Sequence, residues 1–454
     1  MPDGTLPLTE QTIAARLERL PYSRWHITVS AFLGVAIFFD SFDSLALAYV
    51  LPVIARDWHI APQSIGLLIS SANLGQAIGA FFFGWAAERI GRINAARITI
   101  ALYAAMSLAC AFTQNYDQLI VCRFLEGIGL GGEIPVASTY ISEILRAERR
   151  GGSFLAYQMI FPVGLLGAGI AGASVVPTLG WQWMFILGAI PALVALVLRR
   201  ACPESPRWLA SKGRLAEADT IVTAIERIVS KNGAVPLPPV VELKARPEAR
   251  KTRWQELFQG RYLTRTLLVW VLWASSYIIS YGLQGWVPTL YRDVYHLPLQ
   301  QALNYAIANP AGSVVGSILC AIVIDRTGRR AWFIGAFALI AAGLLELWAV
   351  GADTALGFLL GYSFCSMWLG SINMTIFLYT AEIYPTRMRA MGVAWASFWL
   401  RVAATVGPLL VGYAIPRFGI HGMFLIFTIF ALTGVAAALA MIETKRRVLE
   451  EVSP

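Results

Sequence analysis

The chain has 454 residues, of which 57% are apolar and only 14% are charged, with a net charge of +9. A mean hydropathy of +0.61 is typical of a protein with several membrane spans and excludes an ordinary soluble domain. The five cysteines are scattered without paired spacing, and the four histidines fall near predicted span ends. The sequence therefore predicts no metal site, no disulfide framework and no cofactor.

Twelve apolar segments of roughly bilayer length follow in chain order. They cover residues 27–51, 64–86, 98–114, 118–145, 152–175, 181–198, 264–290, 301–324, 331–350, 355–380, 391–414 and 421–441. The connections are short except at 199–263, a charged stretch with a proline run. We predict an all-α membrane protein with an N-terminal six-helix bundle at 1–198, a cytoplasmic linker with short helices at 199–263, and a C-terminal six-helix bundle and cytoplasmic tail at 264–454.

The basic residues gather on one side of this predicted topology. Most of the 36 Lys and Arg residues fall in segments that share a side with both termini. Short loops rich in Lys and Arg stay in the cytoplasm, so we expect both termini there. The positive charge therefore indicates topology and attraction to the membrane surface, and we expect no nucleic acid partner.

The first segment carries two acids, Asp40 and Asp43, inside its apolar run. Three residues apart, they share one helix face. A carboxylate buried in a membrane costs about 2.5–3.5 kcal/mol on insertion scales, so the pair indicates a water-filled path and a proton-coupling role. The alternative is a structural pair, with each carboxylate held by hydroxyls or by an arginine.

The fourth segment carries Arg123, Glu126 and Glu133 along one stripe of its helix. An ion pair between Arg123 and Asp43 is the simplest way to keep both residues buried. We expect the stripe to take part in proton coupling, with protonation of Asp43 releasing Arg123. A static strut is the alternative for this pair, and Glu133 is either a second proton site or a hydrogen-bond partner of a neighbouring helix.

The eleventh segment places Arg401 near the membrane midplane with no acid beside it in sequence. A lone buried guanidinium needs a carboxylate, from another helix or from a substrate, and its planar fork binds one bidentately. We therefore predict a substrate site around Arg401. Aromatic and amide side chains at matching depth complete it: Tyr277, Tyr281, Gln284, Trp368, Asn373, Trp395, Trp399 and Gln158. Because Trp and Tyr are common in membrane proteins, ordinary packing is the alternative for the aromatic members.

A charged motif recurs in the two halves of the chain. Each half has an acid-Arg loop after its second segment, and a Glu followed seven residues later by an Arg at the end of its fourth. These residues are Glu88, Arg89, Arg92, Glu143 and Arg150 in the first half, and Asp325, Arg326, Arg329, Glu382 and Arg389 in the second. The matching positions are separated by nearly the same length of chain. Two related bundles around a central cavity explain this repeat.

These motifs resemble those of the major facilitator superfamily along essentially the whole chain. The acid-Arg-x-Gly-Arg loop in both halves is that superfamily's most specific mark, and PESPRWL at 203–209 resembles its sugar-porter branch. Within that branch, FDSFDS, GLGGEIPVAS, AEIYPTRMR and RVAATVGPLLVGY look most similar to bacterial niacin and aromatic-acid:proton symporters, which are related to organic anion/cation and synaptic-vesicle-protein-like carriers. The seventh segment keeps only Gln284 and Gly285 of the sugar porters' QQxSG-type motif, which disfavours a sugar.

The resemblance implies alternating access, and it implies that the charged loop motifs are conformational latches whose salt bridges hold the outward-facing state. We expect a proton-coupled symporter for a small organic anion, an aromatic monocarboxylate such as nicotinate, acting as a monomer in a bacterial inner membrane. A sugar transporter, an uncoupled facilitator and a non-transporting sensor are the alternatives. The sequence contains no P-loop and no nucleophile–His–acid set, so we expect neither ATP drive nor an enzyme.

Overall fold

The computed structural model describes residues 8–145, 159–193, 202–231, 233–240 and 254–445. Within these ranges the regular structure is helical and contains no strand. Nine of the described helical segments are long and apolar enough to cross a membrane. The predicted all-α membrane fold is therefore confirmed.

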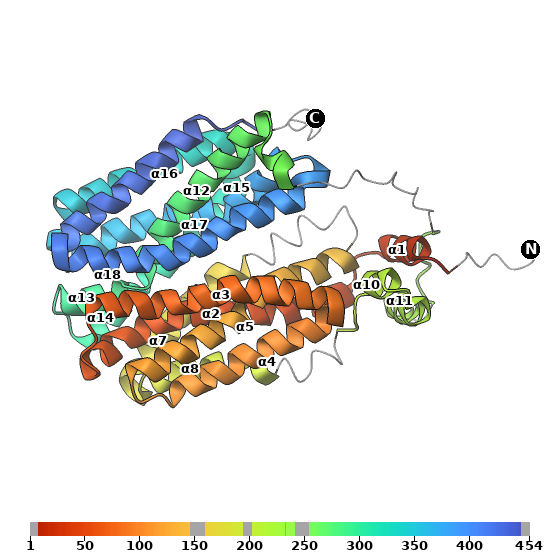
Figure 1. The fold of residues 1–454 in the computed structure, drawn as a ribbon, viewed down its shortest axis with the longest axis horizontal. Helices are drawn as coiled ribbons and strands as arrows, with labels where there is room; N and C mark the ends of the chain where they lie inside the picture. The colour runs from red at the N-terminus through yellow and green to blue at the C-terminus, as the bar shows by residue number, and fades with distance from the viewer. Residues whose placement is uncertain (1–7, 146–158, 194–201, 232, 241–253, 446–454) are drawn as a thin grey trace, which may run out of the picture.

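The first half of the chain forms one group of long helices, seen from red to yellow in Figure 1. These are α2 (Arg24–Asp57), α3 (Pro62–Ile90), α4 (Arg92–Ala111), α5 (Tyr116–Ile144), α7 (Ile160–Leu179) and α8 (Gln182–Gly188). Three shorter helices lie beside the end of the molecule that carries both chain termini, which we call the termini end (Figure 1): α1 (Glu10–Glu18), α10 (Pro206–Ser211) and α11 (Leu215–Val229).

The second half forms the other group, seen from green to blue in Figure 1. Its elements are η1 (Trp254–Phe258), α12 (Arg261–Gln284), α13 (Val287–Asp293), α14 (Leu299–Ala306), α15 (Ala308–Thr327), α16 (Arg329–Ala349), η2 (Gly351–Asp353), α17 (Ala355–Ile383) and α18 (Thr386–Leu439). The last element contains both final predicted segments, which join at Gly419, a residue with φ +66° that no helix interior accommodates.

Polar caps extend several helices beyond the apolar runs that predict them. α2 begins after Ser23, which forms a capping box with His26, so it starts before the predicted residue 27, and it ends at Asp57, beyond the predicted residue 51. The side chain of Asn115 accepts a hydrogen bond from the backbone N–H of Gln118 and starts α5 in the same way. Two predicted segments are broken, at Gly285 between α12 and α13 and at Ile307 between α14 and α15.

Glycines allow α3 and α5 to pack with their backbones in contact. A Cβ added to Gly131 of α5 would lie 2.0 Å from the carbonyl oxygen of Gln76, and one added to Gly127 would lie 2.1 Å from that of Ala72. Only a residue without a side chain fits at such a distance. This contact fixes the position of Gln76, which faces the second half of the molecule.

The two groups touch along α3 and α18, but only over part of their length. Ser70 Oγ donates to the carbonyl oxygen of Thr405 at 2.6 Å, and Asn73 Nδ2 donates to that of Ala404 at 2.9 Å. Nearer the termini end, Gly84 of α3 has no atom within 4 Å of an added Cβ. Figure 1 shows the same arrangement, with the groups meeting near α13 and α14 and diverging toward the termini. The two groups are therefore in contact at one end and their helices lie farther apart at the termini end, an arrangement that we call open at the termini end.

Candidate functional site

A cavity that opens to solvent lies between the two groups of helices. Both halves of the chain contribute side chains to it. The polar lining residues are Asp40, Ser44, Gln76, Tyr277, Ser280, Tyr281, Gln284, Asn309, Ser313, Tyr362, Ser366, Asn373 and Arg401. The apolar ones include Phe161, Leu165, Leu369, Met374 and Phe377. A lining that mixes polar and apolar side chains suits a small organic molecule.

Arg401 of α18 lies in this cavity and is half-buried. Its Nη1 donates to Oε1 of Gln76 on α3, so it joins the two groups nearer the termini end than the bonds of Ser70 and Asn73 do. Among the described residues, no carboxylate lies within ion-pair distance of the guanidinium, although Asp40 interacts with it over a longer range. Arg401 therefore offers a cation to the cavity with donors still to be satisfied.

A buried triad of charges lies in the first half. Arg123 Nη1 donates to both oxygens of Asp43, at 2.9 and 2.8 Å, and to Oε2 of Glu126 at 2.7 Å. All three side chains are at most 3% exposed. The expected ion pair between Arg123 and Asp43 is thus present, and Glu126 shares the same nitrogen. One guanidinium balances one carboxylate, so the triad carries an excess negative charge unless one carboxyl group holds a proton.

Two further acids lie in the same half, with different surroundings. Asp40 is 4% exposed and lines the cavity. Glu133 of α5 is 2% exposed, and neither of its carboxyl oxygens has a hydrogen-bond partner among the described residues. The hydroxyl of Tyr103 on α4 is buried and equally unpartnered within that part of the chain. An ionised carboxylate is not stable in such surroundings, so this position suits a protonated Glu133.

Of the expected aromatic ligands, only the two tyrosines line the cavity. Tyr277 and Tyr281 lie on one face of α12, with ring centroids 6.0 Å apart. The three tryptophans are not among the residues that line it. Trp395 and Trp399 pack against Trp270 at 6.1 and 5.6 Å. Trp368 packs against Trp332 at 5.9 Å.

The amide residues divide in the same way. Gln284 and Asn373 line the cavity, whereas Gln158 lies outside the described residues. The structure adds residues that sequence reasoning did not place in the site: Ser280, Asn309 and Tyr362. Uncharged polar residues recur throughout these helices, so the sequence offers only their depth in the membrane as a signal that they belong to the site.

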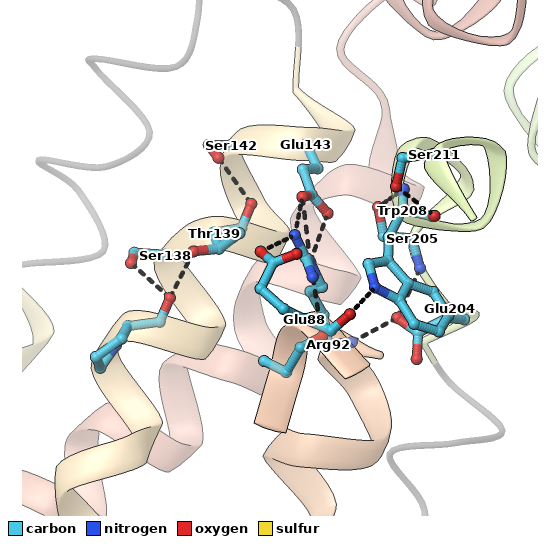
Figure 2. Close-up of polar contacts among 12 residues, drawn as sticks. Glu88, Arg92, Ser138, Thr139, Ser142, Glu143, Glu204, Ser205, Trp208 and Ser211 are labelled. Atoms are coloured by element: carbon cyan, nitrogen blue, oxygen red, sulfur yellow. Dashed lines mark hydrogen bonds and ion pairs between the residues drawn. The ribbon is translucent and has the colours of Figure 1, made fainter. Parts of the chain in front are cut away.

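The charged loop motif joins helices within each half. Figure 2 shows Arg92 between Glu88 and Glu143, with ion-pair distances of 2.8 and 2.9 Å. Glu204 accepts bonds from the backbone N–H groups of Arg92 and Ile93 and so caps the start of α4 (Figure 2).

The second half repeats this arrangement around Arg329, which pairs with Asp325 at 2.9 Å and with Glu382 at 3.0 Å. Glu443 caps α16 through the N–H groups of Arg329 and Arg330. Burial raises the pKa of Glu443, but backbone hydrogen bonds, including those from Arg329 and Lys445, outweigh burial and leave this pKa below its usual value. The ion pairs and helix caps of the first half therefore recur, bond for bond, in the second half.

Other members of the expected latches have different contacts. Arg89 stacks on Trp85, with Cζ 4.2 Å from the ring centroid. Arg326 accepts a bond from Lys445 through its backbone oxygen, and Arg389 Nε has no partner among the described residues. Arg150 lies outside the described ranges. All the observed latch bonds lie within one half and form while the termini end is open, so they do not connect the two halves in this state.

Comparisons with known proteins agree with this architecture. The family model described as Major Facilitator Superfamily matches residues 33–400 and 305–454. The niacin transporter NiaP of Acinetobacter baylyi is 31% identical, covering 97% of this chain and 99% of that one. The 4-hydroxybenzoate transporter PcaK of Pseudomonas putida is 31% identical over 86% of each chain, and the gallate transporter of the same species is 30% identical over 92% and 91%.

Among solved structures, the crystal structure of a D-xylose-proton symporter aligns with a TM-score of 0.73 at 20% identity. The alignment covers 94% of this chain and 100% of that chain. At this identity the likeness concerns the fold alone. The family match and the relatives, taken with the cavity between two helix groups, lead to one conclusion. This chain belongs to the Major Facilitator Superfamily, and it is a multi-pass membrane transporter rather than an enzyme.

Proposed function

We propose that the protein is a proton-coupled symporter that carries a small aromatic monocarboxylate, such as nicotinate, through the central cavity by alternating access. The observation that carries this proposal is Arg401, a guanidinium in the cavity without an ion-paired carboxylate among the described residues. A substrate carboxylate would accept its charge-assisted hydrogen bonds. The substrate then provides the counter-charge that this part of the protein lacks.

The remaining lining supports an aromatic substrate. Tyr277, Tyr281 and Phe377 offer ring faces, and Leu369 and Met374 offer apolar surface. These residues suit a flat ring better than a sugar, whose hydroxyl groups each need a polar partner. Three relatives are named as transporters of niacin, 4-hydroxybenzoate and gallate, and these names support an aromatic acid as the substrate.

The buried acids support proton coupling. Asp43 and Glu126 share one guanidinium, and Asp40 and Glu133 lie nearby without an ion pair in the described chain. Protonation of Asp43 removes its ionic attraction to Arg123, whose charge Glu126 continues to balance. The α2–α5 contact then loosens without exposing an unpaired charge. A proton carried with a monovalent anion also removes net charge from the moving cavity, which lowers the electrostatic barrier in the membrane.

The basic residues at the termini end support placing that end on the cytoplasmic side of a bacterial inner membrane. The lysines and arginines at that end follow the positive-inside rule. We infer that residues 1–198 and 264–454 move as two bundles joined by the linker at 199–263. In the opposite state, α3 and α18 would close at the termini end and separate near Gly66 and Pro408, which are in contact here.

Ligand binding to the purified protein tests the substrate assignment. Nicotinate, 4-hydroxybenzoate and xylose are titrated by calorimetry into wild type, Arg401→Ala and the control Arg417→Ala. Arg417 lies on the same helix but is exposed and stacks on Tyr413. The proposal expects both aromatic acids to bind wild type and the control. It expects Arg401→Ala to bind them at least about tenfold more weakly, because a charged hydrogen bond contributes about 1.5–3 kcal/mol.

Two results would contradict this assignment. Equal affinity of wild type and Arg401→Ala for the aromatic acids would place their carboxylate elsewhere. Binding of xylose in preference to both acids would favour the sugar transporter. Uptake that ignores an imposed pH gradient would instead favour an uncoupled facilitator of the same fold.

A further inference from the structure

A directed chain of hydrogen bonds connects α12 and α17 beside the cavity. Ser276 Oγ donates to Oδ1 of Asn373 at 2.5 Å, and Nδ2 of Asn373 donates to Oγ of Ser280 at 2.9 Å. Tyr277 adds a bond from its hydroxyl to the backbone oxygen of Asn373 at 3.4 Å. The amide of Asn373 is therefore engaged at both its oxygen and its nitrogen.

The direction of this chain determines what Ser280 can still do. A serine hydroxyl has one proton to donate. The oxygen of Ser280 already accepts from Asn373, and none of the described residues accepts a bond from its hydroxyl. Ser280 is 6% exposed and lines the cavity. Its proton is therefore available to a molecule in the cavity, and the bonds behind it polarise the hydroxyl and strengthen it as a donor.

Two of the three other serines that line the cavity have already committed their proton. Ser366 donates to the backbone oxygen of Asn309 at 2.6 Å, and Ser44 donates to that of Asp40 at 2.9 Å. Neither has a proton left for a substrate. This contrast separates Ser280 from hydroxyls that only complete the backbone hydrogen bonding of the helices.

We propose that Ser280 is a specificity-determining residue that donates a hydrogen bond to an acceptor atom on the substrate ring, with Asn373 and Ser276 as its positioning residues. The preferred substrates are aromatic carboxylates with a ring nitrogen or a ring oxygen substituent, over plain benzoate. This inference rests on the proposed function, because Arg401 must hold the carboxylate while Ser280 contacts the ring. Asn373, predicted from the sequence as a ligand, acts here through Ser280.

Benzoate and nicotinate provide a matched pair of probes, since they share size and carboxylate and differ in the ring nitrogen. The measurement is the ratio of the two Kd values, obtained by calorimetry on the purified full-length chain. Wild type is expected to bind nicotinate about five- to tenfold more tightly than benzoate, as one net hydrogen bond allows. In Ser280→Ala the ratio is expected to fall to about one, because nicotinate should bind more weakly while the affinity for benzoate stays the same.

Three further variants separate recognition from a general structural effect. Ser275→Ala removes a neighbouring buried hydroxyl that bonds to Thr433 at 3.1 Å and does not line the cavity, and it should keep the wild-type ratio. Ser280→Thr keeps the hydroxyl and should also keep the ratio. Asn373→Asp replaces the amide donor with an acceptor that draws the Ser280 proton away from the cavity. The ratio of the two Kd values should therefore fall to about one although Ser280 is still present.

The outcomes distinguish this inference from the proposed function. A wild-type ratio near one, or an unchanged ratio in both Ser280→Ala and Asn373→Asp, overturns the role of Ser280 and leaves Arg401 as the anchor. Failure of wild type to bind either acid overturns the proposed function, and this inference with it.

Discussion

At the scale of single residues, the account depends on how the protein balances charge that it buries. Arg123 holds two carboxylates on one nitrogen, whereas Arg401 holds only an amide oxygen. The first arrangement has an excess of negative charge that a proton can neutralise. The second has an excess of positive charge that an anion can neutralise. The two imbalances lie on either side of Asp40, which interacts electrostatically with both Asp43 and Arg401.

Asp43→Asn should separate transport from proton coupling. The variant folds, because Glu126 still balances Arg123 at 2.7 Å, but residue 43 no longer binds a proton. We expect exchange of labelled for unlabelled nicotinate across proteoliposomes at a rate near that of wild type, and at least a tenfold loss of accumulation driven by a pH gradient. Accumulation at the wild-type level would show that Asp43 is not a coupling residue.

The same charge reasoning explains which site residues the sequence predicts. A buried guanidinium needs a carboxylate, so the pairing of Arg123 with Asp43 follows from the sequence. Trp395 and Trp399 do not line the cavity, which the sequence alone does not show, because it gives depth along a helix but not which neighbour each face of the helix meets. Those two rings pack on Trp270. Ser280 could not be identified, since its role depends on the direction of bonds that begin at another helix.

At the scale of elements, apolar runs predict where helices lie, and polar caps and glycines decide where they end and how closely they pack. The breaks at Gly285 and Ile307 are hard to see in hydropathy, because Ile307 stands between two alanines and Gln284 is the only polar residue next to Gly285. The α3–α5 contact shows the effect of glycine most clearly, since the backbone of one helix occupies the space that a side chain of the other would need.

Gly131→Ala should therefore destabilise the protein, although alanine favours helix formation. Its Cβ would lie 2.0 Å from the oxygen of Gln76, so the helices must separate, at a cost of about 1–3 kcal/mol. Gly335→Ala is the matched control, because no atom lies within 4 Å of its added Cβ. It should stabilise α16 by up to about 1 kcal/mol. Thermal unfolding in detergent measures both, and a Tm for Gly131→Ala equal to that of wild type would refute the packing argument.

Ion pairs join the short helices α1 and α11 at the termini end. Glu226 of α11 accepts bonds from Arg16 of α1 at 2.7 Å and from Arg19 at 2.7 Å. Burial raises the pKa of Glu226, but the bonds from these two arginines outweigh it and leave the pKa below its usual value. A carboxylate with a depressed pKa stabilises the folded form above its unfolded pKa, and this stability is lost as the pH falls through the folded pKa.

Docking of α1 on α11 should accordingly weaken only in acid, below the usual titration range of glutamate. Hydrogen exchange of the α1 amides, followed from neutral to acidic pH, measures this release. In Glu226→Gln the α1 amides should exchange faster already at neutral pH, with little further change in acid. Protection in wild type that is lost on raising the pH toward neutrality would contradict the sign of this effect.

At the scale of the whole molecule, two groups of helices enclose one cavity and touch along α3 and α18 on one side of it. Gly66 lies against Pro408 in the closed part, whereas Gly84, farther along the same helix, faces no atom within 4 Å. A transporter that alternates must exchange these two conditions. The amino-acid sequence predicts the two halves from their repeated motifs, but it contains no signal for which end is open.

Gly84→Trp should hold the protein in the open state described here. The larger side chain has room in this state and obstructs closure of α3 against α18 at the termini end. We expect nicotinate binding within about twofold of wild type and transport reduced at least tenfold. Gly335→Trp, at another uncrowded glycine outside the interface of the halves, serves as the control and should transport normally. Normal transport by Gly84→Trp would exclude the proposed closure.

Proton movement during substrate entry distinguishes a proton symporter from an uncoupled carrier. Purified protein is reconstituted into proteoliposomes in weakly buffered medium, nicotinate is added outside, and the external pH and internal nicotinate are recorded together. The account predicts that the medium becomes more alkaline as nicotinate enters, and that Arg401→Ala abolishes both signals. Entry of nicotinate without any change in external pH would contradict it.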